Sequence, residues 1–458
     1  MTDKQIKMVV DLICRDSYEP LTSICNGIQL KPFQTLLAAW IIIQRKFICT
    51  LDTGLGKTVI ASAVMKWLHN AKETEKFVYV VENAGLRQTA SKVGGYTGLR
   101  VLTCNATEAR GLELFDEDED FDILMISYQA LQSYPVAAYL VENIEHFNTI
   151  IFDECQWVSQ LHNSNTWEIV TMMRDKFRDV IMFSATPFKT NPLQLLKQVE
   201  LLDPAILGNT NAYLKDKVVY DKMFGIRDWK DLPGVQEDLT FFVNGFTRED
   251  LGIEIEYTPI AHLIQGTTEQ ADIPHNKMFE IKGRGGERAL EELERTLAHH
   301  VSRGEQGLVY CSTNENKEYL HETLTSRGFN VGVVDGTVSK KKGMNRNTTL
   351  DKYLMGEYDI LLINITTSLD IPSNYCVFYE LCDAGTTVQF IGRCIRGLAD
   401  CDVVVHFFIT LDTYEVEYFY ENLYKKSSYL QATLGKDETV MKTVKQSLDK
   451  VLNSVKEK

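Results

Sequence analysis

The sequence predicts an α/β fold made of two domains, each a mostly parallel sheet covered by helices. Three observations indicate this fold: short aliphatic runs, helix-length segments between them, and a length of 458 residues, too long for one ordinary core. The runs of the first half are Phe47–Leu51, Phe77–Val81, Ile123–Ile126, Thr149–Phe152 and Val180–Phe183. Those of the second half are Gly307–Cys311, Val331–Val334, Asp359–Ile363, Cys376–Tyr379 and Val403–Ile409.

Weaker periodicity marks the expected boundaries of these two domains. Glycine and proline gather between the two series of runs, which predicts a linker with a small insertion over residues 205–276. We therefore expect the first α/β domain at 27–204 and the second at 277–413. Residues 1–26 and 414–458 are expected to be helical extensions, and both could dock a protein partner.

Composition favours a globular protein of the cytoplasm, or of the nucleus if the source is eukaryotic. Apolar residues make up 44% and charged residues 24% of the chain. No apolar run approaches the roughly 20 residues that span a bilayer, so we expect no membrane association, and the first residues do not resemble a secretory signal. Ten cysteines occur without a single CxxC pair, which favours buried free thiols over disulfides or zinc ligands.

The net charge of −15 does not by itself favour a nucleic-acid partner, because phosphates are bound by basic or amide-rich surfaces. Net charge, however, governs solubility and nonspecific attraction, whereas a protein that moves along a strand needs only a local track of basic residues. The motifs therefore carry the functional argument.

A glycine-rich segment after the first strand has the pattern of a phosphate-binding loop. Thr53, Gly54, Leu55, Gly56, Lys57 and Thr58 lie between the strand-like run that ends at Leu51 and the helical pattern that begins at Val59. Glycines let backbone N–H groups surround the phosphates, Lys57 is expected to reach the β and γ phosphates, and the Thr58 hydroxyl is expected to bind magnesium. The first glycine of the full GxxxxGKT pattern is replaced by Leu51.

Two adjacent carboxylates follow another buried strand. Asp153 and Glu154 come directly after Thr149–Phe152. In an enzyme with a phosphate-binding loop, Asp153 would hold magnesium, Glu154 would deprotonate the attacking water, and Gln156 would sense the γ phosphate. The pair predicts ATP hydrolysis only in combination with Lys57, because paired carboxylates in loops are common.

Together these segments resemble the motifs of superfamily 2 helicases and translocases, in the order of that family, from about Leu30 to His406. Leu30–Gln34 resembles the element in which a glutamine, here Gln34, contacts adenine. Phe183–Pro187 resembles motif III, which implies that Ser184, Ala185 and Thr186 couple the nucleotide site to domain closure. The resemblance further implies that both domains are RecA-like.

The second half resembles the remaining motifs of the same superfamily. Leu308–Ser312 resembles motif IV, and Asn364–Pro372 resembles motif V, which places Asp370 near the ribose. Gln389–Arg396 carries the QxxGRxxR pattern of motif VI, in which Gln389 contacts the nucleotide and Arg393 and Arg396 act as arginine fingers. A spacing of three would set these arginines on one face of a helix.

The resemblance implies an ATP- and magnesium-dependent motor that acts on nucleic acid. Ser184–Pro204 and Ile126–Leu131 resemble Swi/Snf-type translocases, so duplex DNA is favoured over RNA. An RNA helicase remains an alternative for two reasons. Ser368–Pro372 is closer to the DEAD-box form, and Gln156 stands where Swi/Snf-type proteins usually have a histidine. A nucleic-acid-gated ATPase switch without translocation is the second alternative. His299 and His300 end a charged helical run and are interpreted as an exposed pair.

Overall fold

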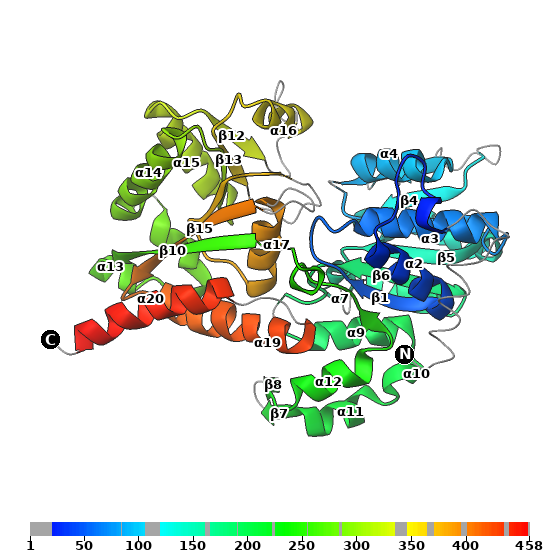
Figure 1. Ribbon diagram of the computed structural model, residues 1–458. Coiled ribbons are helices and arrows are strands. Elements are labelled where there is room, and N and C mark those ends of the chain that lie inside the picture. Colours follow the sequence, from blue (N-terminus) through cyan, green and yellow to red (C-terminus); the bar gives the residue numbers. More distant parts are fainter. Residues whose placement is uncertain are drawn as a thin grey trace. The chain divides into compact units, whose positions relative to one another are not determined.

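Two compact units make up the chain in this computed structural model (Figure 1). The structure describes residues 21–83, 85–105, 120–160, 165–189, 191–221, 225–253, 255–283, 286–334, 346–363, 371–394, 401–434 and 439–456. The first unit comprises residues 1–247 with 432–434, and the second comprises 248–431 with 435–458. Within the described residues, no helix is both long and apolar enough to cross a bilayer.

The first unit is built on a seven-stranded sheet in the order β3-β4-β2-β5-β6-β1-β9, and all its paired strands are parallel. Its strands are β1 (Lys46–Thr50), β2 (Lys76–Val81), β3 (Val101–Cys104), β4 (Ile123–Ser127), β5 (Phe147–Asp153), β6 (Asp179–Ser184) and β9 (Val243–Asn244). Strands β4 and β6 are buried along their whole length, and β2 is buried apart from its first residue, Lys76, because helices cover both faces of the sheet. This burial explains their continuous apolar runs.

Among the described residues, helices form most of the connections between these strands, as the parallel order requires. They are α2 (Pro32–Gln44), α3 (Lys57–Asn70), α4 (Leu86–Thr97), α5 (Tyr128–Leu131), α6 (Tyr134–Glu142), α7 (Gln156–Gln160), α8 (Asn165–Arg174), α9 (Leu193–Leu202), α10 (Pro204–Leu207), α11 (Thr210–Lys217) and α12 (Leu232–Leu239), with short turns η1 (Leu21–Ser23) and η4 (Ile144–His146). A small antiparallel hairpin, β7 (Val218–Asp221) with β8 (Gly225–Trp229), lies beside α11 and α12.

The second unit is built on a six-stranded parallel sheet in the order β10-β15-β14-β11-β13-β12. Its strands are β10 (Ile255–Gln265), β11 (Gly307–Tyr310), β12 (Val331–Val334), β13 (Ile360–Ile363), β14 (Tyr375–Phe378) and β15 (Cys401–Leu411). Its helices are η5 (Glu249–Leu251), α13 (Thr268–Ala271), η6 (His275–Lys282), α14 (Glu287–Val301), α15 (Asn314–Ser326), α16 (Arg346–Leu354), α17 (Ala384–Cys394), α18 (Tyr414–Tyr418), η8 (Phe419–Tyr424), α19 (Lys425–Leu434) and α20 (Thr439–Lys456).

The two parallel sheets confirm the predicted fold class. Separate apolar clusters fill the two faces of the second sheet, one beneath α17 and α20 and the other beneath α14 and α15. The C-terminal helix α20 packs its apolar side, including Met441, Val444 and Leu448, into the first of these clusters. Of the residues for which a linker with an insertion was expected, Val243 and Asn244 extend the first sheet and Ile255–Gln265 extend the second.

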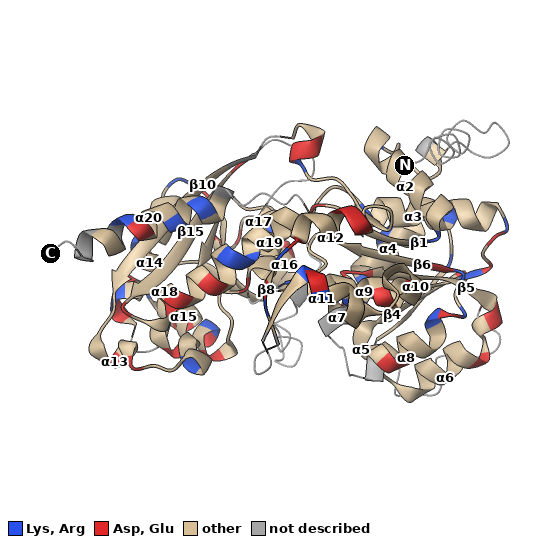
Figure 2. Ribbon diagram, turned by 90° about the horizontal axis from the view of Figure 1, so that it is seen from below, with Lys and Arg blue, Asp and Glu red and all other residues tan. Residues whose placement is uncertain are grey.

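Acidic and basic residues are intermixed over the described elements of each unit (Figure 2). The excess of acidic residues is therefore not concentrated on one element, and lysine and arginine residues occur on many helices. The cysteines fit their predicted role as small apolar side chains, since all eight whose burial is described are buried and belong to no disulfide.

Three histidines of the second unit form a row in which His300 and His406 are buried and His262 is partly buried, and one of them corrects an expectation from sequence. His406 on β15 lies between His262 on β10 and His300 on α14, with nitrogen-to-nitrogen distances of 2.9 and 2.8 Å. Glu292 Oε1 is 2.9 Å from His262 Nδ1, and Glu305 Oε2 is 2.6 Å from His300 Nδ1. The interpretation of His299 and His300 as an exposed pair was wrong for His300, which is 4% exposed.

The row predicts acid sensitivity of the second unit. Burial lowers the pKa of His262 and of His300, and burial with the adjacent histidines lowers the pKa of His406 to about 3. Because the unfolded chain protonates near pH 6.5, stability from the neutral row is complete above that pH and falls as the pH drops towards 3. At pH 5, protonation of His406 in the unfolded chain is expected to lower the free energy of unfolding by up to about 2 kcal/mol relative to neutral pH.

Urea unfolding followed by circular dichroism between pH 7.5 and 5 tests this expectation. His406→Gln, which cannot titrate, should lose less stability over that range than the parent chain. His275→Gln, at an exposed position elsewhere in the second unit, is the control and should behave as the parent. Equal pH dependence of His406→Gln and the parent would refute the assignment.

Candidate functional site

The phosphate-binding loop predicted from Thr53 to Thr58 joins β1 to α3 in the first unit. Gly54 and Gly56 adopt φ angles of 80° and 92°, a conformation that favours glycine. A Cβ atom on Gly56 would lie 2.5 Å from Gln34 Nε2, so no other residue fits there without displacing that side chain. Helix α3 begins at Lys57 without a side-chain cap, which leaves the N–H groups of its first turn available to an anion.

Lys57 joins this loop to the carboxylates at the end of β5. Its Nζ is 3.9 Å from Glu154 Oε1 and 3.5 Å from the Leu51 carbonyl oxygen. The Lys57 and Glu154 side chains are only 11% and 13% exposed. In the sheet, β6 alone separates β5 from β1, so the parallel arrangement brings the two motifs to one edge although about a hundred residues separate them.

The two carboxylates lie in an environment that disfavours a second negative charge. Asp153 is buried, and its Oδ1 accepts a hydrogen bond of 3.1 Å from the Glu154 backbone N–H. Burial first, and the neighbouring Glu154 carboxylate second, raise the pKa of Asp153 to about 7, while Lys57 opposes the shift. Two carboxylates against one lysine leave an excess of negative charge, which an added cation would offset.

A chain of hydrogen bonds leads from Glu154 to the end of β6. Gln156 Nε2 donates to Glu154 Oε2 at 3.0 Å, and the Ser184 hydroxyl donates to Gln156 Oε1 at 2.6 Å. The Thr186 backbone N–H in turn donates to the Ser184 oxygen at 2.9 Å. Ala185 is buried between these two residues. The structure therefore brings together the predicted water-activating carboxylate and the residues predicted for coupling.

Gln34 is also adjacent to the loop, and both ends of its carboxamide bind the protein. Its Nε2 donates to the Leu55 carbonyl at 3.0 Å, and its Oε1 accepts from the Lys31 N–H at 2.9 Å. The side chain is buried and lies at the start of α2. In this conformation Gln34 fixes the loop backbone. Thr58, the expected magnesium ligand, occupies the second position of α3, next to Lys57.

The second unit places Gln389 and Arg393 on α17, where both are buried. Their spacing of four sets them one helical turn apart on the same side of the helix. Helix α17 ends at Cys394. Asp370 and Arg396 lie outside the described residues, as does most of the segment that resembles motif V. Ser312, at the end of the motif IV segment, donates its backbone N–H to Glu380 at 2.5 Å.

Two contacts at this edge of the first sheet were not anticipated. The Tyr128 hydroxyl donates to the Asp153 carbonyl at 2.8 Å. The Phe246 carbonyl lies 3.4 Å from the Asp52 N–H, and Gly245 approaches the Thr50 carbonyl so closely that a Cβ there would lie 2.2 Å away. Gly245, which lies between Phe242 and Phe246, was the one available sequence signal of such a close approach.

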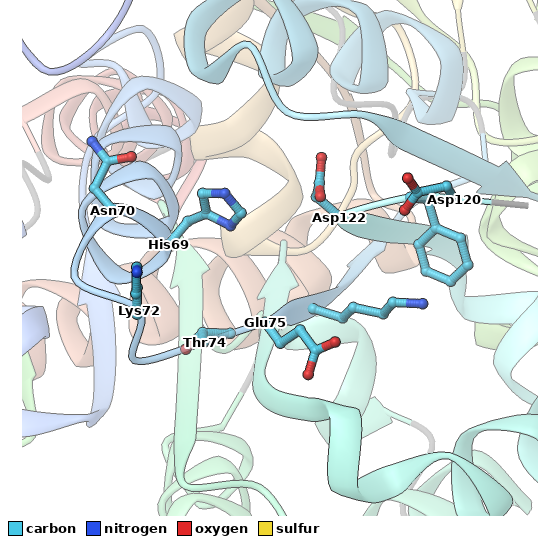
Figure 3. A pocket seen from close by; sticks show the side chains of 9 residues that line it. His69, Asn70, Lys72, Thr74, Glu75, Asp120 and Asp122 are labelled. Carbon is cyan, nitrogen blue, oxygen red and sulfur yellow. The ribbon is translucent and has the colours of Figure 1, made fainter.

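A separate cavity of about 540 Å³ opens at the opposite edge of the same sheet (Figure 3). His69 and Asn70 from the end of α3, Lys76 at the start of β2, and Asp122 before β4 contribute to its lining. Helix α3 begins at the phosphate-binding loop and is about 20 Å long, so this cavity is remote from Lys57. Its lining mixes acidic and basic side chains and contains none of the motif residues.

Two family models match the chain, one over the motifs of its first half and the other over those of its second half. Residues 23–189 match the family described as the res subunit of type III restriction enzymes, and residues 288–397 match the helicase conserved C-terminal domain. Among curated proteins the sequence finds no match. A solved structure similar to this chain is the SWI2/SNF2 ATPase core of Sulfolobus solfataricus in complex with dsDNA. It shares 15% identity with a TM-score of 0.43, over 92% of this chain and 96% of that one.

The two family matches explain why each unit carries a different set of motifs. The first match contains the phosphate-binding loop, the carboxylate pair and Ser184–Thr186, and the second contains Gln389 and both arginines. This pairing of a helicase-type ATPase domain with a helicase C-terminal domain is that of tandem RecA-like motors. The chain belongs to helicase superfamily 2, the ATP-dependent motors of nucleic acid.

Proposed function

We propose that this protein is a Swi/Snf-type translocase that hydrolyses ATP at the edge of the first sheet and moves along duplex DNA. The observation that carries the ATPase assignment is the approach of Lys57 Nζ to within 3.9 Å of Glu154 Oε1, beside an uncapped helix N-terminus. Anion-binding amides, a lysine and a carboxylate base are the groups that phosphoryl transfer to water needs in one place.

Each residue of the first unit then has a defined task. The N–H groups from Gly54 to Thr58 and the Lys57 ammonium bind the phosphates, and Gln34 contacts adenine once its bond to Leu55 opens. Glu154 accepts the proton of the attacking water. Gln156 holds the Glu154 carboxylate in place through its hydrogen bond to Oε2. Gln156 and Ser184 report the presence of the γ phosphate to Thr186.

Magnesium fits the oxygen donors of this site. The Thr58 hydroxyl and the Asp153 carboxylate are hard oxygen ligands of the kind that magnesium prefers, and the excess negative charge around Asp153 favours a divalent cation. Bound there, magnesium would offset the charge of the phosphates. Asp153 would then ionise fully at neutral pH, because a nearby cation lowers a carboxyl pKa.

The second unit supplies the other half of the proposed site. On the resemblance of Gln389–Arg396 to motif VI, Arg393 and Arg396 contact the γ phosphate when ATP is bound, and Gln389 and Asp370 contact the nucleotide. Loss of the γ phosphate after hydrolysis removes the group that both units bind. The resulting cycle of closing and opening changes the spacing between two strand-binding surfaces and moves the protein along its track.

Duplex DNA is the proposed track because Ser184–Pro204 and Ile126–Leu131 resemble Swi/Snf-type proteins. We expect duplex DNA to raise ATP turnover at least tenfold, and single-stranded DNA and duplex RNA to raise it much less. Steady-state ATPase assays with the three polymers, at one fixed salt concentration, provide the measurement. Lys57→Ala, which removes the phosphate-binding ammonium, is the inactive control.

The alternatives predict different results in the same assays. Stimulation by RNA alone would replace the proposal with an RNA helicase. Stimulation by duplex DNA without displacement of a triplex-forming strand would replace translocation with an ATPase switch.

A further inference from the structure

The general-base position is held in a strained backbone conformation. Glu154 has a φ angle of 53°, in the left-handed region, where a residue with a Cβ atom loses about 1–2 kcal/mol. Such a conformation persists only where surrounding contacts determine it. Asp153 ends β5 and Gln156 begins α7, so Glu154 lies in the short turn between a strand and a helix.

Hydrogen bonds on both sides of Glu154 fix this turn. After it, the Cys155 N–H donates to the Phe183 carbonyl of β6 at 3.0 Å. Before it, the Asp153 carbonyl accepts the Tyr128 hydroxyl at 2.8 Å, and the same hydroxyl is 3.5 Å from the Glu154 carbonyl oxygen. The peptide group between Asp153 and Glu154 is therefore held by a side chain from the first residue of α5, directly after β4.

Tyr128 reaches this peptide across a neighbouring strand. It follows β4 directly, and β2 lies between β4 and β5 in the sheet. The pairing of β2 with β5 ends at Phe152, one residue before Asp153. On its other side β5 stays paired with β6 as far as Asp153 and Phe183. The Tyr128 hydroxyl therefore donates to the Asp153 carbonyl just past the end of the β2 pairing.

The hydroxyl is well fixed. Tyr128 is 2% exposed, its ring stacks on Phe152 with centroids 6.5 Å apart, and α5 is capped by the Ser127 hydroxyl, which accepts from the Ala130 N–H at 3.0 Å. Burial, with the nearby Cys155, Asp153 and Glu154, raises the pKa of Tyr128 well above 10. The phenol therefore stays protonated and can donate at every pH at which the protein works.

We propose that Tyr128 is a positioning residue for ATP hydrolysis: its hydroxyl holds the Asp153–Glu154 peptide so that the two carboxylates point to different tasks. With this peptide fixed, the Glu154 N–H closes onto Asp153 Oδ1 and the Glu154 side chain extends to Gln156 and towards Lys57. A rotation of the peptide would move both carboxylates together. This inference rests on the proposed role of Glu154 as the base.

Tyr128→Phe removes only the hydroxyl and keeps the stacked ring. We expect kcat for ATP hydrolysis to fall about tenfold, since a carboxylate displaced from its reactive geometry loses much of its effect, while KM for ATP changes less than twofold. Tyr379→Phe is the matched control, because Tyr379 is also a buried tyrosine whose hydroxyl donates to a backbone carbonyl, that of Lys282, at 3.3 Å in the second unit. It should keep the parent kcat.

A double-mutant cycle with Glu154→Gln separates positioning from general stability. If Tyr128 acts through Glu154, adding Tyr128→Phe to Glu154→Gln leaves the residual single-turnover rate unchanged. A further tenfold loss in the double variant, or a parent-like kcat for Tyr128→Phe alone, would overturn this inference. Parent-like hydrolysis by Glu154→Gln alone would instead overturn the proposed base, so the two failures are distinguishable.

Discussion

Glu154→Gln is expected to lower the rate of ATP hydrolysis about 10²- to 10⁴-fold while ATP still binds. The amide cannot accept the proton of the attacking water, and a general base contributes a factor of that size. Glutamine has nearly the shape of glutamate, and its amide oxygen can still accept from Gln156 Nε2, so the hydrogen-bond chain to Ser184 should survive. Single-turnover hydrolysis and equilibrium binding of ATP, measured on the same preparation, separate the two effects.

Glu168→Gln provides the control, because Glu168 is an exposed carboxylate in the first turn of α8 and loses the same charge. It should hydrolyse ATP at the parent rate. Hydrolysis by Glu154→Gln within twofold of the parent would mean that another group accepts the proton.

Arg396→Ala is expected to lower turnover by about 10³- to 10⁵-fold. An arginine finger stabilises charge that develops on the γ phosphate in the transition state, so its loss affects kcat far more than ATP affinity. Stimulated turnover and ATP binding of the variant provide the measurement. Arg393→Ala should also destabilise the second unit, since Arg393 is buried on α17.

Arg288→Ala is the matched control for the arginine variants, because Arg288 is an exposed arginine on α14 of the same unit. It should leave turnover and ATP binding unchanged. Turnover by Arg396→Ala within a few fold of the parent would remove Arg396 from the proposed site.

Strands with uniform burial were predictable from sequence, whereas the edge strands β3, β9 and β10 were not, although the edge strand β12 was. Ile123–Ile126 was expected from its aliphatic run and lies within β4, whose residues are all buried. Strand β10 was missed, although with β15 it is the longest strand of the second unit. Its sequence did not suggest a strand because Pro259 interrupts it and polar residues alternate along it. β10 is an edge strand paired only with β15, where proline and partial exposure are tolerated.

Some residues of the candidate site could be predicted from local sequence motifs, whereas others come together only through the fold. The loop residues form one contiguous segment, and so does the Asp153–Glu154 pair. The chemistry of each motif could therefore be predicted from sequence without knowledge of the structure. Tyr128 was not, because its contact with Asp153 depends on the order of strands in the sheet. His300 did have a local signal: with Leu293 and Leu297 it continues the buried side of α14 at helical spacing.

The claim on which the proposed function depends is that ATP is hydrolysed at the phosphate-binding loop of the first unit. Its most direct test is steady-state ATP turnover of the parent chain and of Lys57→Ala, with magnesium and saturating duplex DNA. We predict turnover that duplex DNA stimulates in the parent and no detectable turnover in Lys57→Ala. Equal turnover by the two proteins would contradict the assignment of Lys57 and of the site built around it.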